Sequence, residues 1–206
     1  MLITDLKRKG KSETYYVYVN NELYCSMQLE VLYKYHIKVG TEIDEDKFNE
    51  AKVENDKLIC STEALNYVSK RLRTEFQVVE HLKKKGYAQE GIDLAISRLK
   101  SYGYLNDEYF ASLQAKELAK TKGKLFIKRD LISKGVSEDI IQNVLEELDG
   151  DDNSCKEVAA KWLKNKPLPL DLKNKEKLYR FLMSRGYTFD IIKRAVADVT
   201  SFEDFD

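Results

Sequence analysis

The chain repeats one short pattern three times, as 82-LKKKGY-87, 131-LISKGV-136 and 182-LMSRGY-187. In each copy a leucine stands four residues before a glycine, and a cation stands directly before it. The glycines are 49 and 51 residues apart, a spacing typical of internal repeats. A glycine at this place is typical of a helix that ends in a left-handed residue, and the cation suits the negative end of the helix dipole. The pattern therefore predicts three helices with the same ending.

A second helix is predicted after each glycine. Apolar residues recur 6, 9, 10 and 13 positions beyond it, and these offsets define one face of an α-helix. The residues are Ile92, Ala95, Ile96 and Leu99 in the first copy, Ile141, Val144, Leu145 and Leu148 in the second, and Ile192, Ala195, Val196 and Val199 in the third. Ser137 is a candidate cap for the second of these helices.

A further helix leads each copy, and capping signals mark several helix starts. Asn106 is a candidate cap for the helix that leads the second copy. Thr74 with Gln77, and Ser154 with Glu157, have the spacing of capping boxes. In the third copy, residues 166–174 are expected to be a linker to a helix at 175–185.

The predicted fold is mainly α, with three tandem three-helix repeats in an extended, curved array. A small α+β unit with a β-hairpin precedes them. Few residues favour turns, since there are nine glycines and two prolines in 206 residues. The expected segments are 1–60 for the α+β unit, 61–105, 106–150 and 151–206 for the three repeats, with an acidic tail at 200–206.

The first sixty residues have a different pattern from the rest. Aromatic and β-branched residues surround Asn20-Asn21, which predicts two strands and a tight turn. The expected elements are strands in 2–8 and 14–27, a helix in 29–40 that Gly40 closes, an acidic helix in 41–55 whose start Thr41 and Asp44 suit, and a domain boundary near 56–62.

No catalytic or metal-binding pattern is found. The sequence lacks a phosphate-binding glycine loop, a dinucleotide fingerprint and an HExxH motif. His36 and His81 are too few for most zinc sites, and the acidic residues Asp44, Asp46 and Glu50 lack the glycine and terminal glutamate of a calcium loop. We therefore expect a protein that is not an enzyme and has no metal or cofactor.

The expected location is the cytoplasm. The three cysteines, Cys25, Cys60 and Cys155, lie far apart and predict free thiols in a reducing compartment. The first residues have no apolar stretch long enough for a signal peptide, and no window approaches the roughly 18–20 apolar residues of a membrane span. A monomer without membrane contact is expected.

The zero net charge conceals an uneven distribution. Lys and Arg number 15 against 9 Asp and Glu in 62–135, but 9 against 11 in 1–61 and 11 against 15 in 136–206. Similar cations at the same point of three repeats would form a row, which suits a periodic anionic partner, although any single lysine can simply solvate an outer face. The candidate partner-binding residues are Arg71, Arg73, Lys83, Lys84, Lys85, Lys124, Lys128, Arg129, Arg180 and Arg185. Arg71 and Arg73 are the strongest candidates because arginine can bind carboxylate or phosphate in a bidentate way.

Residues 62–200 resemble the RecX family of recombination regulators. The resemblance rests on 71-RLRT-74, 104-YLNDEYFA-111, 122-KGKLFIKRDLISKGV-136 and 177-KLYRFLMSRGY-187. The N-terminal unit resembles the extra segment of longer members from Gram-positive bacteria. The second repeat departs from the family pattern at Lys124, Leu125 and Phe126, at Asp130 and at Asn106.

The resemblance implies a fold of three-helix repeats and a RecA partner. Family members bind RecA and its filaments on DNA, lie in the helical groove and restrain RecA's ATPase and strand exchange. A RecA modulator that is mainly inhibitory is therefore expected, with weak direct DNA contact. A DNA-binding helical-repeat protein is the alternative, since the middle third is basic and three-helix units resemble helix-turn-helix folds.

Overall fold

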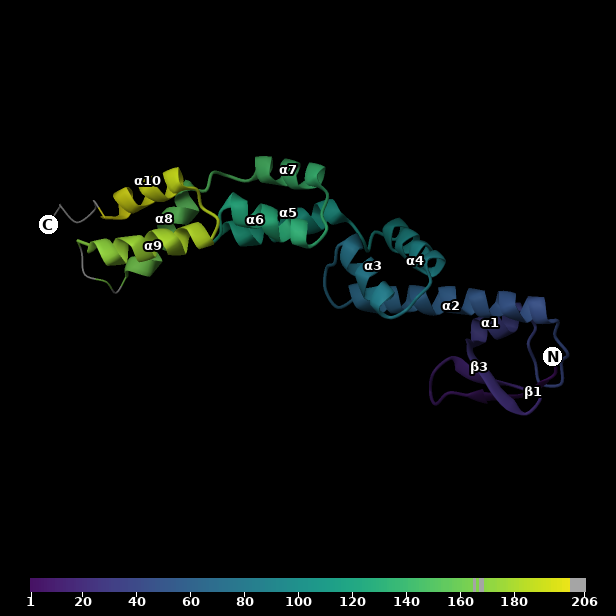
Figure 1. Cartoon of the computed structure of the whole chain (residues 1–206). Coiled ribbons are helices and arrows are strands. Elements are labelled where there is room, and N and C mark those ends of the chain that lie inside the picture. The colour runs from purple at the N-terminus through teal and green to yellow at the C-terminus, as the bar shows by residue number, and fades with distance from the viewer. Residues whose placement is uncertain (165, 167–168, 201–206) are drawn as a thin grey trace. The chain divides into compact units, whose positions relative to one another are not determined.

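The computed structural model describes residues 1–164, 166 and 169–200. The three strands are β1 (Ile3–Arg8), β2 (Thr14–Val19) and β3 (Glu22–Gln28). The helices of the described residues are α1 (Leu29–Lys34), α2 (Glu45–Val68), α3 (Glu75–Lys84), α4 (Gln89–Ser101), α5 (Asp107–Ala119), α6 (Lys124–Ser133), α7 (Glu138–Glu147), α8 (Asp152–Leu163), α9 (Leu172–Ser184) and α10 (Phe189–Thr200) (Figure 1). The expectation for the acidic tail beyond Thr200 falls on residues outside the described part.

The elements form two compact units. The first comprises Met1–Leu72 and Val78–Leu105, and the second comprises Arg73–Gln77 and the chain from Asn106 onward. The mainly α fold, with three three-helix repeats and a small N-terminal sheet, is confirmed. The division into four segments with boundaries after residues 60, 105 and 150 stays a prediction.

The first unit begins with an antiparallel sheet in the order β1-β2-β3. The predicted hairpin and third strand are confirmed. Asn20 and Asn21 both have positive φ, at 51° and 69°, as a tight two-residue hairpin turn requires. Ile3, Val17 and Met27 are fully buried and form the core with residues of α1 and α2. This face of the sheet therefore packs against helices.

One prediction about the N-terminal helices is wrong, and one helix is longer than expected. The predicted helix at 29–40 stops at Lys34, because His36 has a φ of +56° and breaks it before Gly40. Helix α2 runs through residues 56–62, where the expected domain boundary stays a prediction. Asn55 holds α2 against β3: its Oδ1 accepts a hydrogen bond from the Gln28 N–H at 2.8 Å, and its Nδ2 donates to the Ser26 carbonyl at 3.2 Å. No glycine or proline interrupts this stretch, so the helix continues from the sheet into the first repeat.

Each repeat has its own buried core. The first is built from the C-terminal half of α2 with α3 and α4, the second from α5, α6 and α7, and the third from α8, α9 and α10. The leucines of the repeated ending, Leu82, Leu131 and Leu182, have no exposed surface. The isoleucines six residues after each glycine are also buried. The predicted apolar faces are thus confirmed at these positions.

The helix starts agree only in part with the capping signals. Thr74 and Gln77 form the predicted box, since Thr74 Oγ1 accepts from the Gln77 N–H and Gln77 Oε1 accepts from the Thr74 N–H. Asn106 also caps as predicted, accepting from the Tyr109 N–H at 2.8 Å. Ser137 stands at the start of α7 but its side chain makes no capping hydrogen bond.

The helix starts of the third repeat differ from the prediction. Helix α8 begins at Asp152, so Ser154 lies inside it and its hydroxyl donates to the Asp151 carbonyl. Helix α9 starts earlier than the predicted 175, because Asp171 caps it by accepting from the Asn174 N–H at 2.7 Å. A short linker with an acidic cap at its end is hard to separate from the helix that follows.

The three repeated glycines have the predicted left-handed conformation, with φ of 83°, 75° and 86° at Gly86, Gly135 and Gly186. Two of them also allow close contact between repeats. A Cβ on Gly135 would lie 2.3 Å from the side chain of Phe76, and one on Gly186 would lie 2.3 Å from the backbone nitrogen of Phe126. These contacts join the start of one repeat's middle helix to the glycine of the next repeat.

We call these two contacts the repeat joints, and both lie within the second unit. In joint 1, Thr74 Oγ1 donates to the Lys134 carbonyl at 2.6 Å and the Glu75 N–H donates to Asp107 at 3.0 Å. Phe76 covers Gly135. The carbonyl that accepts belongs to the residue just before the glycine.

Joint 2 has three corresponding contacts, with a backbone N–H in place of the threonine hydroxyl. The Gly123 N–H donates to the Arg185 carbonyl at 3.0 Å. The Lys124 N–H donates to Asp151 at 2.9 Å, and Phe126 covers Gly186. In both joints a carboxylate from the next repeat accepts from the first N–H of the middle helix, which is otherwise without a partner at a helix start.

Candidate partner-binding surface

The cations expected to bind a partner differ in what they contact. In the first unit, Arg71, Lys83 and Lys84 are exposed, and no carboxylate of the described chain pairs with them. Arg71 follows the end of α2, and the two lysines lie at the end of α3. Arg73 belongs to the second unit, is half-buried and interacts within the chain. Arg71, Lys83 and Lys84 are therefore available to an external anion.

Lys85 is instead part of a polar cluster. Its Nζ lies 2.8 Å from Glu63 Oε1, and His81 Nε2 lies 2.8 Å from the same oxygen. The Tyr67 ring stacks on the His81 ring with centroids 3.9 Å apart. The hydrogen bond from Lys85, and then that from His81, lowers the pKa of Glu63. Because Glu63 neutralises it, Lys85 attracts an external anion less than its neighbours do.

Several cations of the second repeat have structural partners. Lys124 Nζ donates to the carbonyls of Leu145 and Leu148 at 2.7 and 2.8 Å, and so satisfies groups at the end of α7. Lys128 Nζ lies 2.5 Å from Glu138, an exposed pair. Lys124 is thus committed to the fold, whereas Lys128 can exchange its partner at little cost.

Three arginines of the second unit remain accessible. Arg129 is exposed, and its Nε donates to the Leu125 carbonyl of its own helix at 3.3 Å. Arg180 makes a long, exposed pair with Glu176 at 3.8 Å. Arg185 donates from Nη1 to the Thr121 carbonyl at 3.2 Å. None of these contacts removes the charge from solvent, so all three can still meet an anion.

Lys122 and the candidate residue Arg185 form a cationic site beside joint 2. The pKa of Lys122 is lowered by burial and by the nearby positive charge of Arg185. In the described part of the chain, no carboxylate pairs with either residue. Lys122 Nζ lies 4.4 Å from the centre of the Phe126 ring, and Arg185 Cζ lies 4.5 Å from that of Phe181. The site combines two positive charges with aromatic faces.

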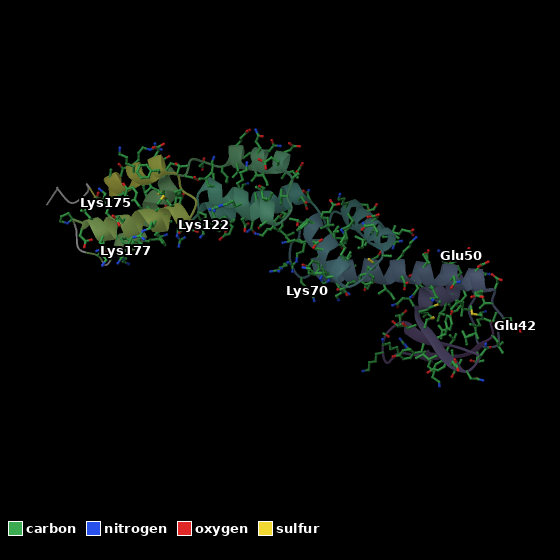
Figure 2. The ribbon with its side chains drawn as sticks, viewed as in Figure 1. Glu42, Glu50, Lys70, Lys122, Lys175 and Lys177 are labelled. Atoms are coloured by element: carbon green, nitrogen blue, oxygen red, sulfur yellow. The ribbon has the colours of Figure 1, made fainter. Side chains whose placement is uncertain are left out.

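The aromatic faces continue beyond Phe181. The Trp162 ring is 6.5 Å from that of Phe181, and Lys166 Nζ is 3.7 Å from the Trp162 ring. Figure 2 shows Lys122 away from Lys175 and Lys177, which belong to the N-terminal part of α9. Because Lys122 and Arg185 are 63 residues apart, only the fold brings them together. Which cations contact a partner stays a prediction.

Among the described residues, neither a metal cluster nor a membrane-spanning helix occurs. No cluster of three or more His, Cys, Asp or Glu side chains suited to a metal ion occurs there. No helix in that part is long and apolar enough to cross a membrane. Three thiols occur at Cys25, Cys60 and Cys155, and burial raises the pKa of Cys155 to about 12 and that of Cys25 to about 11.

The fold and its charged surface define a helical-repeat protein built from three tandem three-helix units. Family comparison then identifies the repeats. Residues 62–99 match "RecX, first three-helix domain", 106–145 match "RecX, second three-helix domain" and 150–196 match "RecX, third three-helix domain". The chain belongs to the RecX family, which confirms the resemblance noted in the sequence.

Curated relatives match along almost the whole chain. "Regulatory protein RecX" of Clostridium botulinum (strain Alaska E43 / Type E3) is 35% identical, with 99% of each chain covered. "Regulatory protein RecX" of Bacillus licheniformis is 31% identical over 97% of this chain and 77% of the relative. The similarity therefore includes the N-terminal sheet as well as the repeats.

Two solved structures have the same fold. A "Crystal structure of regulatory protein RecX" superposes with a TM-score of 0.67 at 20% identity and covers 95% of this chain and 98% of the other. The crystal structure of RecX from Lactobacillus salivarius gives a TM-score of 0.61 at 26% identity, over 71% of this chain and 97% of the other.

Proposed function

We propose that this protein binds RecA and its filaments on DNA and restrains RecA's ATPase, filament growth and strand exchange. The observation that carries the proposal is full-length similarity to proteins named regulatory protein RecX, at 35% identity. The mechanism is a clamp. Cations of the repeats bind acidic surfaces of neighbouring RecA subunits and so oppose either the motion needed for turnover or the addition of subunits.

The distribution of partnered cations supports a clamp made by particular residues. Arg71, Lys83 and Lys84 have no carboxylate partner in the described chain, so no internal ion pair has to break when a partner binds. Lys124 already holds two carbonyls of its own repeat. The clamp surface therefore includes the first three and does not use the Lys124 ammonium.

The test is the single-stranded-DNA-dependent ATPase of the RecA from the same organism, titrated with this protein. Loss of activity below one molecule per RecA subunit supports a clamp or cap on the filament. Loss only at a ratio that follows the amount of free DNA contradicts the clamp and favours competition for DNA. No effect at any ratio, with both proteins folded, contradicts the proposed function.

Direct DNA binding is the second candidate function, and the site of Lys122 and Arg185 favours it. Two close cations beside half-buried aromatic rings suit a phosphate backbone with stacked bases. The zero formal charge of the chain opposes strong unaided affinity. DNA contact would thus add to RecA binding through the second and third repeats.

Salt dependence separates the two candidates. Binding to single-stranded DNA alone, followed by fluorescence anisotropy, should have a log–log salt slope of about −0.7 per phosphate contact. Lys122→Glu should reduce that slope, and Lys193→Glu serves as a control on an exposed position of α10. An unchanged slope in Lys122→Glu would exclude this site as a DNA contact.

A further inference from the structure

The first repeat carries a third copy of the surface that accepts a helix start in the two joints. In joints 1 and 2 the acceptor has a carboxylate on the leading helix, the carbonyl of the residue before a glycine, and the bare glycine itself. Gly86 is the glycine of the first repeat, and nothing lies within 4 Å of the place where its Cβ would be. This copy of the surface is therefore uncovered.

Asp56 is the carboxylate of this third copy. In the second repeat, Asp107 is followed by two fully buried small residues, Ala111 four positions later and Ala115 eight positions later. In the third repeat the same register is Asp151, Cys155, Ala159, and in the first it is Asp56, Cys60, Ala64, with both small residues again fully buried. Because the buried residues fix the rotation of the helix, Asp56 holds the position of the two carboxylates that accept in the joints.

The groups of this third acceptor surround one pocket of the first unit. The pocket has a volume of about 380 Å³ and is lined by Asp56, Lys85, Gly86, Tyr87 and Ala88 among others. Asp56 is exposed, and no hydrogen bond or salt bridge of the described chain reaches its carboxylate. In that same part of the chain, no N–H or hydroxyl donates to the Lys85 carbonyl. Its equivalents at Lys134 and Arg185 both accept from a helix start.

The third repeat does not offer a matching helix start to another copy of the chain. Counting back from the glycine, Lys175 corresponds to Glu75 and Lys124, whose N–H groups donate across the joints. The Lys175 N–H already donates to the Asp171 carbonyl at 2.9 Å, because α9 begins one turn earlier. Charged residues, Glu176 and Lys177, stand where the joints have phenylalanine. Head-to-tail stacking of copies is therefore disfavoured, and the occupant must be another protein.

We propose that the pocket at Gly86 binds the N-terminus of a helix from a partner protein. The helix has free N–H groups in its first turn and a phenylalanine or similar large apolar side chain there. The first N–H donates to Asp56, a cap hydroxyl or N–H donates to the Lys85 carbonyl, and the apolar side chain covers Gly86. The proposal goes beyond the proposed function and does not require that the partner is RecA.

A peptide of the chain's own joint provides the probe. The acetylated peptide LRTEFQVVEHLKKK, residues 72–85, contains the cap of Thr74 and the phenylalanine Phe76. It is titrated into the ¹⁵N-labelled full-length protein, and amide shifts are followed by NMR. We expect saturable shifts at Gly86, Tyr87 and Ala88, with weak affinity because the free peptide must first become helical.

Variants on both sides define the contact. Asp56→Lys should weaken binding by about tenfold, the loss expected for one charge-assisted hydrogen bond, and the Phe76→Ala peptide should also bind more weakly. Glu50→Lys is the matched control, since Glu50 is an exposed acid of the same helix outside the pocket (Figure 2), and it should bind as the wild type does. The spectra themselves report whether each variant is folded.

Three results would overturn the proposal. One is the absence of shifts at Gly86 up to the solubility limit of the peptide. Another is equal affinity for the wild-type and Phe76→Ala peptides, or an equal loss in Asp56→Lys and Glu50→Lys. The third is a change in the Gly86 amide chemical shift with protein concentration alone, because a second copy of the chain would then occupy the pocket. None of these results depends on RecA, so they leave the proposed function to its own test.

Discussion

Alanine substitutions at the three repeated glycines separate backbone strain from contact between repeats. An alanine in the left-handed region costs about 1–2 kcal/mol, and Gly86→Ala should cost no more, since nothing lies near the added Cβ. At Gly135 the added Cβ also meets the side chain of Phe76. The nearest atoms of Phe76 are its Cβ and Cγ, both 2.3 Å away. Rotation of the ring does not move the Phe76 Cβ, so joint 1 must shift and weaken the hydrogen bonds from Thr74 to Lys134 and from Glu75 to Asp107.

Gly186→Ala should likewise be more destabilising than Gly86→Ala. Its Cβ would meet the backbone of Phe126, which cannot move without separating joint 2. The hydrogen bond from Gly123 to the Arg185 carbonyl and that from Lys124 to Asp151 would then be lost. A neutral hydrogen bond contributes about 1 kcal/mol and one to a charged group about 1.5–3 kcal/mol. The total loss is therefore about 3–6 kcal/mol.

Urea unfolding measures these differences. Circular dichroism follows all helices, and the fluorescence of Trp162, the single tryptophan, follows the third repeat. Two probes are needed because repeats need not unfold together. Gly135→Ala and Gly186→Ala should both destabilise the chain more than Gly86→Ala. Equal losses at all three positions would refute the role assigned to the joints.

Three further outcomes are expected. Burial raises the pKa of Asp151 above its ordinary 3.8, so the folded chain binds more protons than the unfolded chain just above that pH. The contribution of this group to stability therefore falls as pH rises from the unfolded to the folded pKa. Asp151→Asn should flatten that part of the stability–pH curve measured by urea unfolding, and an unchanged curve would contradict the raised pKa. Lys124→Met should lower the free energy of unfolding by about 1–3 kcal/mol, because two carbonyls at the end of α7 lose their donor. Lys128→Met is the control: it removes only an exposed ion pair and should lower that free energy by less than about 1 kcal/mol. The Cys155 thiol, with a pKa of about 12, should react with a disulfide reagent at pH 8 far more slowly in the folded than in the urea-unfolded chain, and equal rates would contradict its burial.

The repeats could be predicted because their signals are local and recur. Glycine φ values depend on one residue, and the apolar offsets of each helix follow from its own period. The continuous α2 could not be predicted in this way. Its course through 56–62 depends on Asn55 bonding to β3, a contact between residues far apart in the sequence. Nor could periodicity place the start of α9, since Asp171 extends it by local capping.

The candidate surface was predictable as residue types but not as accessible charges. The sequence identifies Lys124 and Arg71 alike as cations, and only the fold shows that the first holds carbonyls of α7. The joining of Lys122 to Arg185 likewise requires the fold. The register of Asp56 with Cys60 and Ala64 was present in the sequence and could have been found by aligning the leading helices.

The most direct test of the account is binding to preformed filaments of RecA on single-stranded DNA, measured by sedimentation. Wild-type protein should pellet with the filaments, and the triple reversal Arg71→Glu/Lys83→Glu/Lys84→Glu, at three exposed cations, should remain mostly in the supernatant. Lys38→Glu, an exposed reversal in the N-terminal unit, should pellet as the wild type does. Co-sedimentation of the triple reversal at the wild-type level would contradict the assignment of these cations. Folded wild-type protein that stays in the supernatant would contradict the proposed function itself.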